Sequence, residues 1–352
     1  MRIGIVAPPW VPVPPPRYGG TEAVVDRLAR GFQTAGHEVL LWTTGDSTCP
    51  VPRRWVLDHA EPDRMGFDAI ELHHLVRGYQ AMLEWGADVV HDHTLIGPVY
   101  ACRYPELPVV TTNHGPFDLA LSALYQAVGD DVPIIAISHD QASRAGDVPI
   151  AAVIHHGIDL DTYPAGDGGG DEQGGYFLFL GRMAPEKGAR RAALAARQAG
   201  VRLVIAAKMQ EPWEHEFYEQ QVRPLLTDDV TYVGEVGRDD KIRLLQGATA
   251  LVNPIRWPEP FGLVMIEALA CGTPVLAYRE GSTPEIVDHG VTGFLCDDVD
   301  DLAARLGEAH LLDRDVCRGV AERRFSTARM VVEHLALFER VVAERSRPRT
   351  CS

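Results

Sequence analysis

The chain has 352 residues, of which 46% are hydrophobic and 23% are charged, and its formal net charge is −16. This length exceeds what a single hydrophobic core usually holds, so we expect two globular domains. An acidic surface repels nucleic acids and anionic lipid headgroups, which argues against nucleic-acid binding and membrane contact. No apolar run approaches the roughly 18 residues that a membrane-spanning helix needs.

The N-terminus and the cysteines indicate a cytoplasmic protein. Met1 and Arg2 lead directly into the β-type run 3–7, without the apolar core and small-residue cleavage site of a signal peptide. The six cysteines lie far apart and form no Cys-x-x-Cys pair. This spacing disfavours a zinc knuckle or a disulfide framework and is typical of a reducing compartment.

The first half of the chain alternates strand and helix patterns. Five short apolar runs read as buried parallel strands: 3–7, 39–43, 88–91, 109–112 and 134–138. Between the first two lies a helical pattern whose apolar face consists of Ala23, Val24, Leu28 and Phe32. Gly36 follows where a left-handed helix cap is expected. This order predicts a doubly wound α/β domain, with a parallel sheet covered on both faces.

A glycine-rich acidic segment, 165–175, interrupts this pattern. Such a composition buries little apolar surface, so we expect a flexible linker between domains at 1–164 and 176–325. Further strands are expected at 176–180, 203–206, 231–233, 250–253 and 275–277, and a long helix at 327–345. Because open α/β sheets bind ligands beyond the carboxyl ends of their strands, functional residues should follow strands and face a cleft between the domains.

The segment 257–268 follows the strand that ends at Asn253 and carries two glutamates, Glu259 and Glu267. Pro260 suits the first turn of a helix, where its missing N–H has no cost. The helix dipole and the free amides of Phe261, Gly262 and Leu263 would then favour a phosphate. Two glutamates eight residues apart on a helix are separated by about 12 Å, comparable to the two sugars of a nucleotide-diphosphate sugar. Alternatively, Glu259 is only an acid at a helix N-terminus and Glu267 a solvated one.

Two cations, Arg182 and Lys187, lie in the loop after the strand at 176–180. An Arg fork and a Lys point charge would stabilise the negative charge that a diphosphate gains as its bond to a sugar breaks. Taken alone, they are more typical of surface cations.

Two further candidate sites lie in the first half. Gly19 and Gly20 precede the first helix, where paired glycines allow a phosphate to approach the backbone, although a plain helix start is an equal alternative. His114 follows the strand at 109–112 and could donate to a sugar hydroxyl or act as a structural histidine. In His91-Asp92-His93, strand alternation places the two histidines on one face, and we assign this string to the cleft wall without chemistry.

Taken together, these blocks resemble the retaining glycosyltransferases of family four. The resemblance rests on Glu259-x7-Glu267 within Glu-Pro-Phe-Gly-Leu-Val-Met-Ile-Glu-Ala, Gly181-Arg182 with Glu186-Lys187-Gly188, Tyr18-Gly19-Gly20-Thr21-Glu22, Gly272-Thr273-Pro274-Val275 and Gly293-Phe294-Leu295. Their order and spacing cover nearly the whole chain, which favours functional roles for the charged residues. Trp257-Pro258 departs from the family pattern, in which small residues are frequent before the first glutamate.

The resemblance implies the GT-B fold, with two Rossmann-like domains that bind the acceptor on the first and the sugar nucleotide on the second. A C-terminal helix at 326–346 would pack back on the first domain. By motif position, Arg182 and Lys187 would hold the diphosphate and Glu267 the ribose. The resemblance implies that Glu259 and the Phe261–Leu263 amides contact the sugar and phosphate, and that His114 contacts the sugar. It also implies that Gly19 and Gly20 approach the diphosphate and that backbone near Val236 contacts the base.

The resemblance also implies transfer with retention at the anomeric carbon, without a metal ion or other cofactor. We expect a UDP- or GDP-type sugar donor and a small-molecule or oligosaccharide acceptor. The residue usage is typical of a high-GC bacterium, which suggests an enzyme of saccharide-antibiotic biosynthesis. Two alternatives are a nucleotide-sugar epimerase, which would need acid–base groups such as His114, and a non-catalytic sugar-nucleotide-binding subunit. The sequence does not indicate the oligomeric state.

Overall fold

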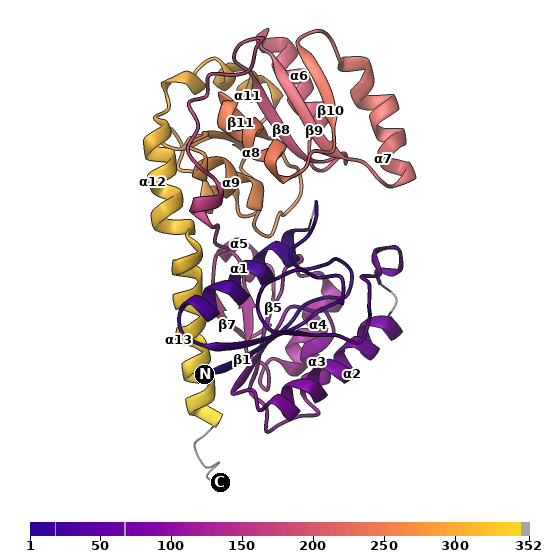
Figure 1. The fold of residues 1–352 in the computed structure, drawn as a ribbon. Helices are drawn as coiled ribbons and strands as arrows, with labels where there is room; N and C mark the ends of the chain where they lie inside the picture. The colour runs from indigo at the N-terminus through magenta and orange to yellow at the C-terminus, as the bar shows by residue number, and fades with distance from the viewer. Residues whose placement is uncertain (18, 67, 346–352) are drawn as a thin grey trace. The chain divides into compact units, whose positions relative to one another are not determined.

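The computed structural model describes residues 1–17, 19–66 and 68–345 (Figure 1). The chain forms two compact units: unit 1 contains Met1–Gly157 and Thr327–Ser352, and unit 2 contains Ile158–Ser326. Tyr18 of the glycine-pair motif and residue 346, the expected end of the last helix, lie outside the described residues.

Unit 1 is built on a parallel sheet of seven strands in the order β3-β2-β1-β4-β5-β6-β7. The strands are β1 (Arg2–Val6), β2 (Glu38–Trp42), β3 (Arg53–Arg54), β4 (Val89–Asp92), β5 (Val109–Thr112), β6 (Ile134–Ala136) and β7 (Ile150–Val153). The residues of β1, β2, β4 and β5 are almost all buried, as expected for strands covered on both faces.

The helices of unit 1 cover this sheet. They are α1 (Gly20–Thr34), η1 (Pro62–Arg64), α2 (Asp68–Trp85), α3 (Gly97–Ala101), α4 (Leu119–Val128), α5 (His139–Ser143) and α13 (Thr327–Arg345). The last of these packs on α1, although about 300 residues of sequence separate the two. Gly31 permits this close approach, because a Cβ there would lie 2.4 Å from Val331 Cγ2.

Unit 2 contains a parallel sheet of six strands in the order β10-β9-β8-β11-β12-β13. The strands are β8 (Phe177–Arg182), β9 (Leu203–Lys208), β10 (Val230–Gly234), β11 (Ala250–Asn253), β12 (Val275–Tyr278) and β13 (Gly293–Cys296). An apolar cluster that includes Phe179, Ile205, Val252 and Leu276 forms its core.

Helices of unit 2 form two groups, one that contains α6 and α11 and another that contains α8, α9 and α12. Their bounds are η2 (Leu160–Thr162), α6 (Ala189–Ala199), α7 (Pro212–Phe217), the π-helix η3 (Tyr218–Val222), η4 (Arg223–Leu225), α8 (Arg238–Gly247), α9 (Leu263–Ala270), α10 (Thr283–Ile286), α11 (Val299–Leu306), η5 (Ala309–Leu311) and α12 (Arg314–Phe325). Two doubly wound parallel sheets confirm the expected Rossmann-like fold class.

Each of the ten expected strands is present, with ends that shift by at most two residues. Three strands were not predicted: β3 has only two residues, β7 is partly exposed, and the sequence of β13 was assigned only to a motif. The expected cap at Gly36 is confirmed by its φ of +89° and by His37 N–H, which donates to Phe32 O at 3.1 Å.

The expectation of a flexible linker at 165–175 is wrong, because this segment belongs to unit 2 and the chain passes between the units at Gly157–Ile158. Gly166 N–H donates to Cys271 O at 2.9 Å, and Gly168 N–H donates to Gln246 O at 3.0 Å. A Cβ at Gly166 would lie 2.3 Å from Gln246 O. The glycines therefore allow the backbone to pass close to the end of α8, a role that composition alone does not distinguish from flexibility.

Candidate donor site

Three candidate residues of unit 2 lie at the topological switch point of its sheet. β8 and β11 are neighbours, and the chain continues outward from them to β9 and β12 in opposite directions. In such sheets the carboxyl ends of the two central strands open a crevice that binds ligands. Arg182 is the last residue of β8, Lys187 follows in the next loop, and Glu259 lies in the segment after β11. The three residues thus come from two adjacent strand ends.

Lys187 and Glu259 form an ion pair at this end of the sheet. Lys187 Nζ donates to Glu259 Oε2, and the two side chains are only 17% and 16% exposed. The indole N–H of Trp257 donates to the same oxygen, and its ring centroid lies 4.9 Å from Lys187 Nζ. Trp257, noted in the sequence only as a departure from the family pattern, is therefore a partner of both charged groups.

Arg182 is paired with a carboxylate that the sequence analysis missed. Arg182 Nε donates to Glu214 Oε1, and the guanidinium lies 4.8 Å from the ring centroid of Trp213. Glu214 is in α7 and is buried. The one local signal in the sequence is the spacing of Glu211 and Glu214 around Pro212, which is typical of a helix N-terminus. Nothing in that spacing links the helix to Arg182.

The loop before α9 differs from its prediction. The helix begins at Leu263, with Gly262 as its N-cap at a φ of +85°, so Pro260 precedes the cap instead of occupying the first turn. Consequently, Glu259 and Glu267 do not share a helix, and the expected spacing along one axis is wrong. Contacts from Ser282 hold the loop: its N–H donates to Glu259 O at 3.1 Å, and its hydroxyl donates to Phe261 O at 2.5 Å.

The Lys187 loop is held against the same region by the side chain of Arg191, which donates to two backbone carbonyls. Arg191 Nε donates to Pro254 O at 2.7 Å, and its Nη2 donates to Glu186 O at 2.9 Å. Gly188, at a φ of +95°, lies so close to this strand end that a Cβ would be 2.4 Å from Pro254 O. The loop that carries Lys187 is therefore fixed to the segment that leads to Glu259.

Glu267 is buried in α9, so the alternative of a solvated glutamate is excluded. Its Oε1 accepts hydrogen bonds of 2.7 Å from both Lys241 Nζ and the hydroxyl of Tyr163. Val236, expected near the base, is half-buried in the segment between β10 and α8. We still predict that Glu267 contacts a ribose and that Val236 lies near a base.

Gly19 and Gly20 belong to unit 1, at the start of α1. Gly20 is the first helical residue and Gly19 is the N-cap. A Cβ at Gly19 would lie 2.7 Å from Pro15 Cβ and 2.9 Å from Glu22 Oε2, so the glycine allows the loop after β1 to approach the helix. Burial raises the pKa of Glu22 to about 7. The loop after β1 leaves the sheet of unit 1 at the topological switch point of that sheet, which lies between β1 and β4.

His114 lies in a cluster of five histidines within unit 1. Nδ1 of His93 and Nε2 of His114 are 2.8 Å apart, and His156 stacks on His114 with ring centroids separated by 5.2 Å. The expected shared face of His91 and His93 is confirmed by ring centroids 4.0 Å apart, and His334 of α13 lies 5.0 Å from His91. The cluster joins three strand-end segments to a helix from the other end of the chain.

These histidines are neutral at neutral pH, since burial lowers their pKa values. The pKa of His114 falls to about 3 and that of His334 to about 4, and His91, His93 and His156 lie well below the ordinary value. A neutral imidazole has one N–H donor and one acceptor nitrogen. The arrangement therefore lets His114 take part in hydrogen bonds without adding a positive charge.

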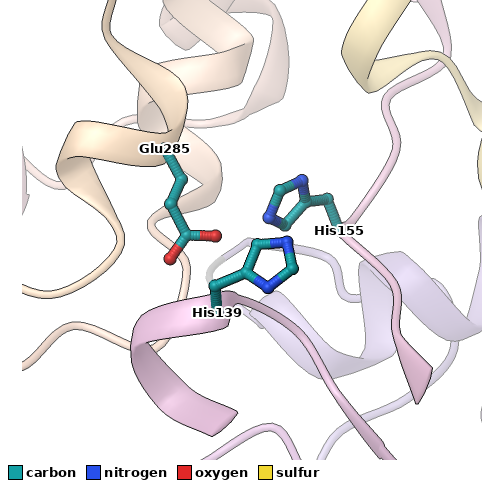
Figure 2. A group of neighbouring side chains, drawn as sticks. All are labelled: His139, His155 and Glu285. Carbon is teal, nitrogen blue, oxygen red and sulfur yellow. The ribbon is translucent and has the colours of Figure 1, made fainter. Parts of the chain in front are cut away.

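Two more histidines of unit 1, His139 and His155, lie beside each other (Figure 2). Their ring centroids are 5.8 Å apart and their planes are perpendicular. His139 begins α5, and His155 follows β7. Arg329 of α13 donates through Nη2 to the carbonyl oxygens of His155 and His156, at 2.5 and 3.2 Å. The last helix therefore fixes the segment of His155 and His156 that follows β7.

Comparison with known proteins finds a family match in each half of the chain. Residues 167–321 match the family described as "Glycosyl transferases group 1", and residues 18–162 match "Glycosyltransferase Family 4". Both matched families are glycosyltransferases. In the described residues, no helix combines the length and the apolar character required to cross a bilayer.

Individual relatives agree with this class. D-inositol 3-phosphate glycosyltransferase of Mycobacterium sp. (strain KMS) is 30% identical over 291 residues, which are 71% of this chain and 63% of the relative. The chain thus spans less than two thirds of the length that this relative has. The crystal structure of AviGT4, a glycosyltransferase involved in avilamycin A biosynthesis, is 27% identical, with a TM-score of 0.71 over 97% of this chain and 98% of AviGT4.

A further solved structure, Anabaena HepE in complex with UDP and glucose, is 19% identical, with a TM-score of 0.75 over 96% of this chain and 99% of HepE. At this identity the likeness concerns the fold alone. Together with the two parallel sheets, these solved structures confirm the expected GT-B fold class.

Proposed function

We propose that the chain is a retaining glycosyltransferase that moves a sugar from a nucleotide-diphosphate sugar to a small-molecule or oligosaccharide acceptor. The observation that carries the proposal is the pairing of Lys187 with Glu259 beside Trp257, at the switch point of the unit 2 sheet. A cation for phosphate and a carboxylate for sugar hydroxyls adjoin there, which matches the two chemical parts of such a donor.

The charges indicate how the reaction would proceed. The bond between the anomeric carbon and the phosphate oxygen breaks, and a bond from that carbon to the acceptor oxygen forms. Arg182 and Lys187 would stabilise the negative charge that develops on the departing diphosphate. In the front-face scheme implied by the family resemblance, that diphosphate takes the proton of the acceptor hydroxyl. This scheme would need no metal ion, since Arg182 and Lys187 would balance the charge of the leaving group.

A uridine donor is the first candidate, because the related fold of HepE was solved with UDP and glucose and also with UDP-glucose. The inositol phosphate glycosyltransferases and AviGT4 support a small polyol or saccharide acceptor, including one from a natural-product route. In the same proposal, the backbone of Gly19 and Gly20 would contact the diphosphate. His114 would form a hydrogen bond with the sugar.

The test starts with thermal-shift screening against UDP, GDP, ADP and dTDP, because a ligand that binds the folded state raises the melting temperature. The sugar nucleotides of the selected base are then incubated with polyol and saccharide acceptors, with and without EDTA. NMR of the product should show the anomeric configuration of the donor, at a rate that EDTA leaves unchanged. Inversion, or loss of turnover with EDTA, would contradict the mechanism, whereas conversion of the donor to an epimer without acceptor would establish an epimerase.

A further inference from the structure

Glu214 is a buried carboxylate in the first turn of α7, and it faces the arginine that ends β8. Both of its oxygens accept hydrogen bonds. Oε2 accepts from the backbone N–H groups of Gln210 at 2.7 Å and Glu211 at 2.9 Å, while Oε1 accepts from Arg182 Nε. A carboxylate with this set of donors is held in one orientation, so it offers Arg182 a fixed partner.

Glu214 is ionised at neutral pH despite its burial. Burial raises its pKa, but the hydrogen bonds from the Gln210 amide, Arg182 and the Glu211 amide outweigh that effect, and the pKa lies below its ordinary value. The contact with Arg182 is therefore charge-assisted. Because one partner is only 1% exposed, it differs from the mobile ion pairs of the protein surface.

The contact fixes one edge of the guanidinium and leaves the other edge open. Glu214 takes Nε, and the ring of Trp213 lies 4.8 Å from the guanidinium carbon. Among the described residues, Glu214 is the only hydrogen-bond acceptor of this guanidinium, whose side chain is 36% exposed. The two Nη groups therefore stay available as the fork that binds phosphate oxygens in pairs.

We propose that Glu214 is a positioning residue that holds Arg182 in the orientation in which its Nη groups meet the leaving diphosphate. This inference rests on the proposed function of the site. A guanidinium already oriented where charge develops needs no reorganisation in the transition state, so the benefit appears mainly in turnover. Glu214 itself does not touch the substrate in this proposal.

The test is the substitution Glu214→Gln, because an amide cannot accept hydrogen bonds on both sides as the carboxylate does. We expect kcat, measured as release of the nucleoside diphosphate, to fall about tenfold, with a dissociation constant for UDP within about threefold of wild type. Glu211→Gln alters the same helix start without a contact to Arg182, and it should keep kcat within twofold.

A double-mutant cycle separates positioning from a structural effect. In an Arg182→Ala background, Glu214→Gln should lower kcat by less than twofold, because its effect passes through Arg182. A full tenfold further loss in that background, or wild-type kcat in Glu214→Gln alone, would overturn the proposal. The single variant Arg182→Ala tests the proposed function separately. If it retains wild-type kcat, Arg182 does not have the role that the proposed function assigns to it.

Discussion

Lys187 and Glu259, 72 residues apart in the sequence, form an ion pair in which Lys187 Nζ and the indole N–H of Trp257 donate to the same carboxylate oxygen. The pair is mostly buried, so each charge depends on the other in the absence of substrate. In the proposed reaction, a phosphate would compete with Glu259 for Lys187. The indole N–H would then continue to hold the carboxylate.

Glu259→Gln is expected to lower kcat by roughly 10²-fold, because the amide removes the charge that would bind sugar hydroxyls while it keeps the side-chain shape. Steady-state kinetics with the selected donor, together with thermal denaturation, measures this. Glu280→Gln, which alters the pairing of a glutamate with Arg256 in the same unit, is the matched control and should retain activity. Turnover near wild type in Glu259→Gln would remove Glu259 from the mechanism.

Trp257→Phe should lower kcat about tenfold. Phenylalanine keeps an aromatic face for Lys187 but loses the N–H bond to the carboxylate, and hydrogen bonds to charged groups contribute about 1.5–3 kcal/mol. The matched control is Trp55→Phe in unit 1, where the indole N–H donates to Asp58 Oδ1 at 3.2 Å at an exposed position. Equal effects of the two variants on kcat would mean that the indole N–H has no special role at Glu259.

Gly188→Ala is expected to weaken UDP binding by more than fivefold, since its Cβ would collide with Pro254 O and displace the loop of Lys187. Gly200→Ala provides the control, because Gly200 also has a positive φ, +65°, but a Cβ there meets nothing within 4 Å. Both variants should lose about 1 kcal/mol of unfolding free energy through backbone strain. Calorimetric titration with UDP distinguishes them, and unchanged affinity in Gly188→Ala would refute the placement of Lys187 at the donor.

The buried histidines should make a contribution to the stability of unit 1 that falls as the pH drops below about 6.5. The buried histidines have pKa values lower in the folded state than in the unfolded chain, so the unfolded state binds more protons in this range. Their contribution is complete above the unfolded pKa and is lost as the pH falls towards about 4, the folded value of His334. The loss amounts to at most about 1.4 kcal/mol per pH unit for each histidine.

His334→Leu tests this dependence, because leucine cannot take up a proton. Urea denaturation at pH 7 and pH 5 should show a smaller difference in unfolding free energy for His334→Leu than for wild type. Substitution of the exposed His310 by leucine should leave the difference unchanged. An equal pH dependence in wild type and His334→Leu would contradict the protonation argument.

The alternating strands and helices were predictable because buried parallel strands and amphipathic helices have strong apolar periods. β3, with two residues, carries no such period, and this is why it was missed. The start of α9 was also predictable only in part. Pro260 suits a first helical turn, but the backbone contacts from Ser282 and the positive φ of Gly262 move the start to Leu263. These are tertiary effects, which local preference does not encode.

The motif residues of the site were predictable because their type and order match a known pattern, whereas their partners were not. Glu214 pairs with Arg182 across 32 residues, and Lys241 pairs with Glu267 across 26. Neither partner stands in a recognisable motif. Their roles follow only from the folded arrangement, in which α7 adjoins the end of β8 and α8 adjoins α9.

The two segments that make up unit 1 have a consequence for synthesis on the ribosome. Phe338 of α13 lies 5.5 Å from Phe32 and 5.3 Å from His91, measured between ring centroids, so the last helix supplies part of the unit 1 core. Unit 2 is one continuous stretch and can acquire its full core as soon as it has left the exit tunnel. The N-terminal segment of unit 1, by contrast, keeps part of its apolar surface exposed until the final helix has been synthesised. Unit 2 can therefore complete its core before unit 1 does, although unit 1 begins first in the sequence.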